Sequence, residues 1–251
     1  DRARLRALAL EYLPTTPTYP SSARAHGLTK AHLRSTWYAQ IMAAKEKKGM
    51  PPTGWCAEHI KCLAANLMGD LSLILEAIAT YNVPELFRDF ILCSIRLMAT
   101  LKTDSDDPTS IPTLENGIRP LATLDPWRQI ATAPLNKKLA KLNRDRLVAH
   151  GQMGTAVPGG PDACALFCQL LLEYCPGAIL GKADISNAYN SMKRAFMANV
   201  LLEEGLLEML RLFLFYYVAP TRYWMQNGVV VNELLATMGI AQGDSTGTNT
   251  Y

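Results

Sequence analysis

Hydrophobic residues recur at helical spacing over most of the chain, and turn-forming residues separate one such stretch from the next. The pattern predicts helices at 1–13, from Thr29 to Gly49, from Trp55 to Tyr81 and from Pro84 to Leu101. A run rich in Pro, Thr and Ser at 14–22 predicts a linker after the first helix.

The middle of the chain continues this pattern with two more helices. Over 117–142 a short extended piece is expected to give way to a helix rich in Lys and Arg. Further on, Pro161 occupies a first helical position and Asp162 the first turn of another helix. The expected apolar face of this helix is Ala163, Leu166, Phe167, Leu170 and Leu171.

Two signals for strands follow. A short apolar run that starts at 178 and ends at Asp184 predicts a strand with a carboxylate at its C-terminal end. Ser186 or Asn187 is then expected to cap a helix that continues to residue 205. Asn227 and Gly228, between RYWMQ and VVVNE, are typical of a tight β-hairpin. The predicted fold class is α+β, rich in helices and with a small antiparallel sheet.

Composition excludes some classes of protein. The 251 residues are 49% hydrophobic, which is enough for one substantial core and argues against a disordered chain. The formal net charge is only +3, so any contact with nucleic acid is expected to be local. The longest apolar runs, such as 71–78 and 212–218, are shorter than the roughly 20 residues that cross a bilayer, which predicts no membrane span.

Six cysteines are dispersed through the helical patterns, which favours a reducing intracellular compartment such as the nucleus or the mitochondrion. Cys56, His59 and Cys62 follow one another on successive helical turns. They form no CxxC pair and leave the fourth position of a zinc site unfilled. We therefore expect buried thiols and a histidine on the surface.

Several short motifs follow one another in a specific order. They are a loop at Lys102, Arg119-Pro120-Leu121, Arg128, Gln152-Met153-Gly154 before a Pro-Gly-Gly turn, DISNAYN at 184–190 and GIAQGD at 239–244. This succession resembles the blocks of reverse transcriptases. The sequences DISNAYNSMKR and VPGGPDA are similar to those of non-LTR retrotransposon polymerases. The resemblance to group II intron enzymes is more distant. The resemblance covers 55–251 and is most specific from 117 onward.

The resemblance implies a right-hand polymerase, with an N-terminal helical extension at 1–54, fingers at 55–177 and a partial palm at 178–251. It also implies RNA-directed DNA polymerase chemistry, a phosphoryl transfer that uses two divalent cations, Mg²⁺ or Mn²⁺. Asp184 matches the first metal-binding carboxylate, next to the backbone carbonyl of Ile185. Both offer the oxygen donors that Mg²⁺ requires. The alternative role for Asp184 is to cap a helix.

The resemblance also assigns residues that bind the nucleotide. Tyr189 matches the aromatic residue under the sugar of the incoming nucleotide, which excludes a 2′-hydroxyl; its alternative is a core side chain. Arg119 matches the arginine that clamps the triphosphate, since a planar guanidinium fits phosphate oxygens, and Lys102 is its loosely matched partner. Gln242 and Gly243 match the turn against which the templating base pair packs, where glycine permits close approach.

Two further residues, Arg128 and Gln152, match positions that contact the template strand, and ordinary surface polarity is the alternative for both. The partners implied are RNA or an RNA/DNA hybrid. A further polypeptide that supplies the rest of the palm, or a ribonucleoprotein assembly, is implied as well.

The sequence departs from the family in two places. After Asp244 a Pro-Leu-Ser type continuation is usual, whereas this chain has Ser245-Thr246-Gly247-Thr248. The Tyr/Phe-x-Asp-Asp motif that supplies the remaining carboxylates is absent, and Asp106-Asp107 stands upstream in a polar loop. Because one Asp cannot hold two metals, the chain alone is expected to be inactive. It is thus predicted to be a polymerase fragment, or alternatively an inactive RNA-binding or scaffold protein of a ribonucleoprotein such as a ribosome.

Overall fold

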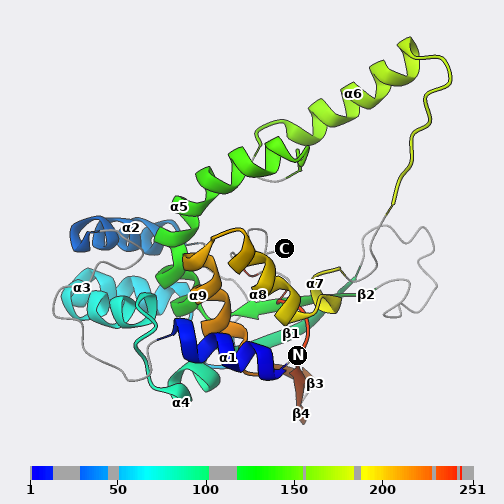
Figure 1. Ribbon diagram of the computed structural model, residues 1–251. Coiled ribbons are helices and arrows are strands. Elements are labelled where there is room, and N and C mark those ends of the chain that lie inside the picture. The colour runs from blue at the N-terminus through cyan, green and yellow to red at the C-terminus, as the bar shows by residue number, and fades with distance from the viewer. Residues whose placement is uncertain are drawn as a thin grey trace.

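The computed structural model describes residues 2–13, 29–44, 51–101, 118–154, 157–183, 188–227, 230–241 and 244, without the side chains of 99–101, 118–120, 140–143, 226–227 and 230. The first elements are α1 (Arg2–Tyr12), α2 (Lys30–Ala43), α3 (Ala57–Ala79), α4 (Glu85–Phe87), a π-helical turn η1 (Arg88–Leu92), β1 (Ser94–Leu101) and β2 (Ile118–Leu124). They are followed by α5 (Pro126–Ala149), α6 (Gly160–Tyr174), α7 (Ala188–Ser191), α8 (Arg194–Glu203), α9 (Leu207–Tyr217), β3 (Thr221–Asn227) and β4 (Val230–Ala236). The helix-rich α+β class is confirmed (Figure 1).

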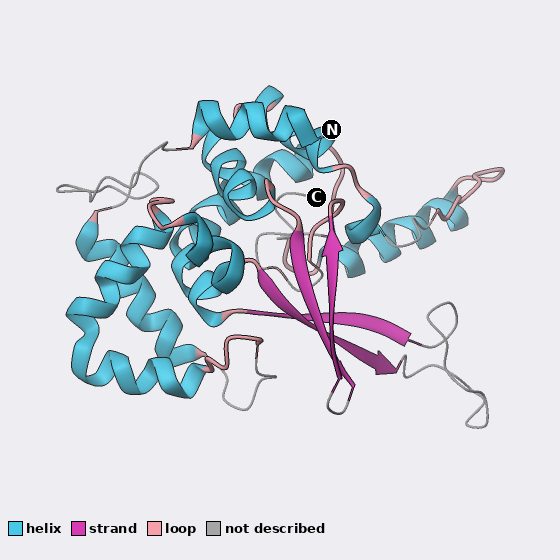
Figure 2. Cartoon of the chain, turned by 90° about the horizontal axis from the view of Figure 1, so that it is seen from below, coloured by secondary structure: helices cyan, strands magenta, loops and turns pink. Residues whose placement is uncertain are grey.

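The four strands form one sheet in the order β2-β1-β3-β4, with most of the helices gathered at one end of it (Figure 2). β1 runs antiparallel to β2, and β3 runs antiparallel to β4, which confirms the predicted hairpin. Asn227, expected between the strands, is the last residue of β3 and pairs with Val230. The central pair, β1 and β3, is parallel, with Ser94 opposite Arg222. The expected antiparallel sheet is therefore corrected to a mixed one. The reason is that η1 and α9 deliver these two strands from the same end.

One hydrophobic core joins the helices of the N-terminal and C-terminal parts. Its buried residues include Leu5, Leu8, Leu33, Trp37, Ile60, Leu75, Leu135, Leu201 and Phe213. α9 is buried at nearly every position, and α1 packs against α8 and α9. The predicted regions 1–54, 55–177 and 178–251 thus share this core, and their boundaries as functional regions stay a prediction.

The predicted N-termini of two helices are confirmed. The Thr29 hydroxyl accepts a hydrogen bond from the His32 amide at 3.3 Å and caps α2, which ends at Ala43, earlier than the expected Gly49. Pro161 lies in the first turn of α6, as predicted.

The helix expected from Pro84 to Leu101 is wrong in its second half. Helical structure ends at Leu92, and the residues from Ser94 onward form β1. This strand lies between β2 and β3, so its backbone is hydrogen-bonded on both sides and Ile95 is fully buried. Pairing in the middle of the sheet has overridden the helical spacing of the apolar residues.

Two predictions around the DISNAYN motif also need correction. Residues 178–183 form no strand, and the Ile179 side chain is 94% exposed. The three-residue apolar run lies between Gly177 and Gly181, which weakens strand formation. The single helix expected after Ser186 or Asn187 is two helices, α7 and α8, because the backbone is extended at Lys193.

The apolar face predicted for α6 is not covered by any described residue. Leu166, Phe167 and Leu170 are 56%, 64% and 43% exposed. Figure 1 shows the reason: the C-terminal half of α5 leaves the core and carries α6 away from the sheet. The predicted helix with its apolar face is present, and that face is left largely exposed among the described residues.

α3 is the described helix that bears on the expectation of no membrane span. Its 23 residues are long and apolar enough to cross a bilayer by length and composition. Among the described helices it alone meets that test, which the core helix of a globular protein also passes. Ile60 and Leu75 of α3 belong to the central core, and the helix packs against α2 and α5. We therefore treat α3 as a core helix.

All six cysteines are free thiols. Cys93 is buried, but Cys62 is exposed and Cys56 is half-buried, so the expectation of buried thiols there is wrong. His59 is exposed as expected and meets the ring of Trp55 edge-on. In the described parts of the chain, no three His, Cys, Asp or Glu side chains gather closely enough to hold a metal ion.

The N-terminus of α5 carries a buried carboxylate with an unusual titration. Asp125 accepts hydrogen bonds from the Trp127 amide at 2.9 Å and from the Thr53 hydroxyl at 2.5 Å. Burial raises the pKa of this carboxyl from 3.8 to about 6, although both hydrogen bonds act to lower it. The folded protein therefore binds this proton more tightly than the unfolded chain does.

Stability is expected to fall as the pH rises through the window between 3.8 and about 6. The Asp125 contribution to the fall is on the order of 3 kcal/mol at most. Asp125→Asn keeps the cap, since the Thr53 hydroxyl can rotate to accept from the amide, and it removes the titration. Urea unfolding of both proteins at several pH values measures this. An equal pH dependence in the two proteins would show that Asp125 does not titrate in this way.

Candidate functional site

The short helix α7 positions Tyr189 beside the turn that follows β4. The Tyr189 side chain is half-buried against the central core. Its backbone carbonyl accepts a hydrogen bond from the Ile240 amide at 2.8 Å, and the Met192 carbonyl accepts one from the Gly239 amide at 2.8 Å. Because α7 stops before Lys193, the Met192 carbonyl is available for this contact. Two segments about fifty residues apart are thereby joined edge to edge.

Gly239 makes this contact possible. Its φ of 64° lies in the left-handed region that side chains disfavour. A Cβ atom added there would lie 2.5 Å from the Asn190 Cα and would also collide with the Tyr189 carbonyl oxygen. The backbone of the turn can therefore approach α7 this closely only with glycine at this position.

Arg194, the first residue of α8, fixes the same turn from inside the protein. Its Nε donates to the Gly239 carbonyl at 2.8 Å, and its Nη1 donates to the Ala219 carbonyl at 3.0 Å. Its Nη2 donates to the Thr221 hydroxyl at 2.8 Å. Burial lowers the pKa of this guanidinium, opposed mainly by the nearby Tyr217. The side chain thus connects the start of α8, the end of α9 and the start of β3.

A second buried arginine holds the far end of the turn. The Arg128 guanidinium on α5 is paired with the carboxylate of Asp244, and both side chains are almost completely buried. The Tyr217 hydroxyl donates to the same carboxylate at 2.5 Å and accepts from the Ala241 amide at 3.2 Å. Arg128 also lies over the ring of Tyr216, at 3.9 Å from its centroid.

These contacts keep the Arg128 guanidinium charged and the Tyr217 hydroxyl protonated. Burial lowers the pKa of the Arg128 guanidinium, but the Asp244 carboxylate raises it more, and the net pKa lies above its ordinary value. Burial and the Asp244 charge together raise the pKa of Tyr217 well above its ordinary value, so its hydroxyl stays protonated and donates. The network therefore orders the turn rather than supplying a group that exchanges protons near neutral pH.

Five residues assigned by the family resemblance lie outside the described residues. They are Lys102, Asp184, Ile185, Gln242 and Gly243. Their predicted roles in catalysis, metal binding and nucleotide binding stay predictions. The chain on either side of them is described in part: 184–187 immediately precedes α7, and 242–243 stands between Ala241 and Asp244.

The remaining assigned residues are distributed over three places. Arg119 lies on β2 opposite Thr100 of β1, and its side chain is outside the described atoms. Gln152 is exposed in the connection between α5 and α6, where its Oε1 accepts from the Gly154 amide at 2.7 Å. Arg128 is 1% exposed, so the alternative of surface polarity is wrong for it, and its buried position does not support a template contact. The structure thus brings Tyr189 and Arg128 to one turn but leaves Gln152 apart from it.

Sequence reasoning missed two residues of this arrangement, Arg194 and Tyr217. A signal was present for Arg128, since it is the one charged residue in a largely apolar stretch, Pro126 to Leu135. No local signal identifies their partners, because Asp244 is 116 residues away from Arg128.

No protein-family model matches the chain, and no curated protein matches it significantly. The fold and the site define a helix-rich α+β protein. In it, the turn at Gly239 packs on the short helix α7, which follows Asp184 in the sequence.

Proposed function

We propose that this chain is the fingers and leading palm of a reverse-transcriptase-like, RNA-directed DNA polymerase of the non-LTR type. The observation that carries the proposal is the packing of Gly239 and Ile240 against Tyr189. The segments that most resemble the family, DISNAYN and GIAQGD, were identified from their sequences alone, yet the structure brings them into contact. A polymerase needs them together, because the nucleotide and the templating base must meet at one place.

In this proposal each residue has a limited task. The Asp184 carboxylate and the Ile185 carbonyl would hold Mg²⁺, and as oxygen donors they suit this ion. When bound, the metal would stabilise the charge that develops during phosphoryl transfer. Tyr189 would support the sugar of the nucleotide, and Arg119 with Lys102 would bind its phosphates. Arg128 and Arg194 would act only by positioning the turn that contains Gln242.

The exposed apolar face of α6 supports a further polypeptide as partner, one that supplies the rest of the palm. A helix with Leu166, Phe167 and Leu170 exposed gains stability when a second apolar surface covers it. The same observation favours the second candidate function, a scaffold protein without catalysis that is held inside a ribonucleoprotein. The two functions share the RNA partner and differ in whether Asp184 is needed.

Binding to RNA or to an RNA/DNA hybrid is expected to be weak and strongly dependent on salt. Lys137 and Lys138 are exposed on α5, whereas Arg128 is buried and contributes no phosphate contact. Replacing both lysines with Gln should therefore reduce the slope of log K against log salt by about 1.5, from the loss of two phosphate contacts.

Filter binding over a salt series measures this slope. Arg34→Gln, an exposed residue on α2, is the matched control and should leave the slope unchanged. Tight binding that is insensitive to salt, or an equal effect of the control, would contradict a phosphate contact on α5.

A further inference from the structure

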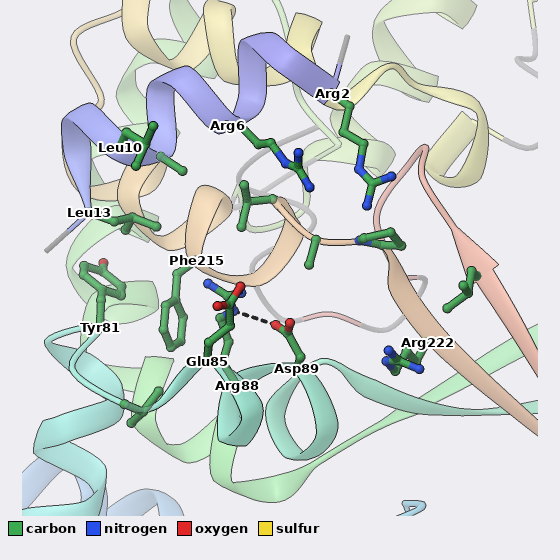
Figure 3. Close-up of a pocket in the computed structure, with 16 residues that line it drawn as sticks. Arg2, Arg6, Leu10, Leu13, Tyr81, Glu85, Arg88, Asp89, Phe215 and Arg222 are labelled. Carbon is green, nitrogen blue, oxygen red and sulfur yellow. Dashed lines mark hydrogen bonds and ion pairs between the residues drawn. The ribbon is translucent and has the colours of Figure 1, made fainter. Parts of the chain in front are cut away.

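A pocket of about 800 Å³ lies between α1, the segment from the end of α3 to η1, the end of α9 and the β3–β4 hairpin (Figure 3). Its volume falls within the range of small-molecule sites, about 300–1,000 Å³. Neither the turn residues Gly239 and Ile240 nor Tyr189 and Met192, to which they bond, line it. The pocket is therefore a separate feature of the chain.

α1 supplies the wall that carries free positive charge. Leu5 and Leu8 are buried against the core, which turns the neighbouring face of the helix, with Arg2 and Arg6, toward the pocket. Figure 3 shows both guanidinium groups reaching from α1 toward the opposite wall. Neither arginine forms an ion pair with another residue in the described part of the chain.

The cations of the opposite wall are already neutralised. Arg88 pairs with Asp89 at 2.7 Å and with Glu85 at 3.1 Å. Arg222 is paired with Glu233 and lies over the ring of Phe90. Among the described residues, the positive charge of the pocket that has no ion-pair partner is therefore concentrated at Arg2 and Arg6, which stand one helical turn apart.

The floor is apolar and contains a residue in a strained conformation. Tyr81 has a φ of 62° at the C-terminal end of α3, where the Asn82 amide bonds to the Ala77 carbonyl at 2.8 Å. Glycine is the usual residue at such a helix end, because a side chain is disfavoured there. Tyr81 instead places an aromatic ring in the pocket lining, 5.3 Å from the ring of Phe215. Strain of this kind concentrates at binding sites.

We propose that this pocket binds a small organic phosphate that carries a flat apolar group, of the size of an aryl phosphate or a nucleoside monophosphate. A carboxylate has two oxygens, which a single guanidinium fork satisfies, whereas a phosphate monoester can accept from both Arg2 and Arg6. The apolar group would lie on Leu10, Tyr81 and Phe215. The proposal does not rest on polymerase function.

Calorimetric titration of the purified chain with phenyl phosphate and with adenosine monophosphate tests this. EDTA is present, so that binding at a metal-dependent nucleotide site does not contribute. Both ligands should bind at least about tenfold more tightly than inorganic phosphate or adenosine, since each of these lacks one half of the recognised chemistry. Equal binding of inorganic phosphate, or no binding of either organic phosphate, would overturn the proposal.

Variants on α1 locate the site. Arg2→Gln combined with Arg6→Gln should weaken both organic phosphates about tenfold or more, through the loss of charge-assisted hydrogen bonds. Arg4→Gln removes a charge from the same helix, but Arg4 bonds to Asn199 on α8 and does not line the pocket, so affinity should change less than about twofold. All three side chains are exposed, and thermal unfolding checks that the variants fold. An equal loss in Arg4→Gln, or no loss in the double variant, would contradict the assignment.

Discussion

Replacing Arg128 with Met is expected to lower the free energy of unfolding by about 3–5 kcal/mol. The substitution keeps an unbranched side chain of similar length but leaves the Asp244 carboxylate buried without its cation. Both partners of this pair are almost fully buried, so water cannot take the place of the guanidinium. The stacking of Arg128 on the Tyr216 ring is lost as well.

Urea unfolding measures the effect, and two comparisons separate its causes. Arg144→Met, on the same helix but at an exposed ion pair, should change stability by less than about 0.5 kcal/mol. Combining Arg128→Met with Asp244→Leu removes the buried charge and should restore a large part of the loss. If Arg128→Met is as mild as Arg144→Met, the buried pair does not form in the folded protein.

Gly239→Ala is expected to have the second large effect, about 3 kcal/mol or more. The added Cβ would collide with the backbone of α7, and the turn can avoid it only by giving up the two hydrogen bonds to Tyr189 and Met192. The unfavourable φ of 64° adds to this loss.

Gly205→Ala is the matched control. Gly205 has a similar φ of 68°, but a Cβ atom there would meet nothing within 4 Å. Its replacement should therefore cost only the conformational part, about 1 kcal/mol. Thermal or urea unfolding of both variants gives the difference. Equal losses would mean that the turn does not pack on α7, and the main support for the proposed function would disappear.

An element could be predicted when the residues that determine it are close together in the sequence. It could not be predicted when they are far apart. A few neighbouring residues determine the cap at Thr29, the helix start at Pro161 and the β3–β4 hairpin, and all three features were predicted correctly. The apolar spacing of β1 predicts a helix, because the strands that pair with it, β2 and β3, lie elsewhere in the chain. The apolar face of α6 could be predicted, but an apolar helix face does not reveal what covers it.

The candidate site divides in the same way. Tyr189 and the glycine turn could be found because each belongs to a motif with recognisable wording. The buried role of Arg128 could not, since it depends on Asp244 and on the two tyrosines at the end of α9. A charged residue inside an apolar helical stretch is a useful sign of such a partner, although it does not name one.

Primer extension tests the central claim most directly. The purified chain is incubated with an RNA template, a DNA primer, deoxynucleotides and Mg²⁺, with or without a second polypeptide that carries a Tyr/Phe-x-Asp-Asp palm segment. We expect no extension by the chain alone and extension when the second polypeptide is added. Asp184→Ala should reduce the rate of that extension by about 10³-fold or more, because the carboxylates act as one catalytic unit and the loss of one disables the others. Asp162→Ala, in the first turn of α6, should leave it unchanged. Extension by the chain alone that survives Asp184→Ala, or no extension with any such partner, would contradict the polymerase proposal.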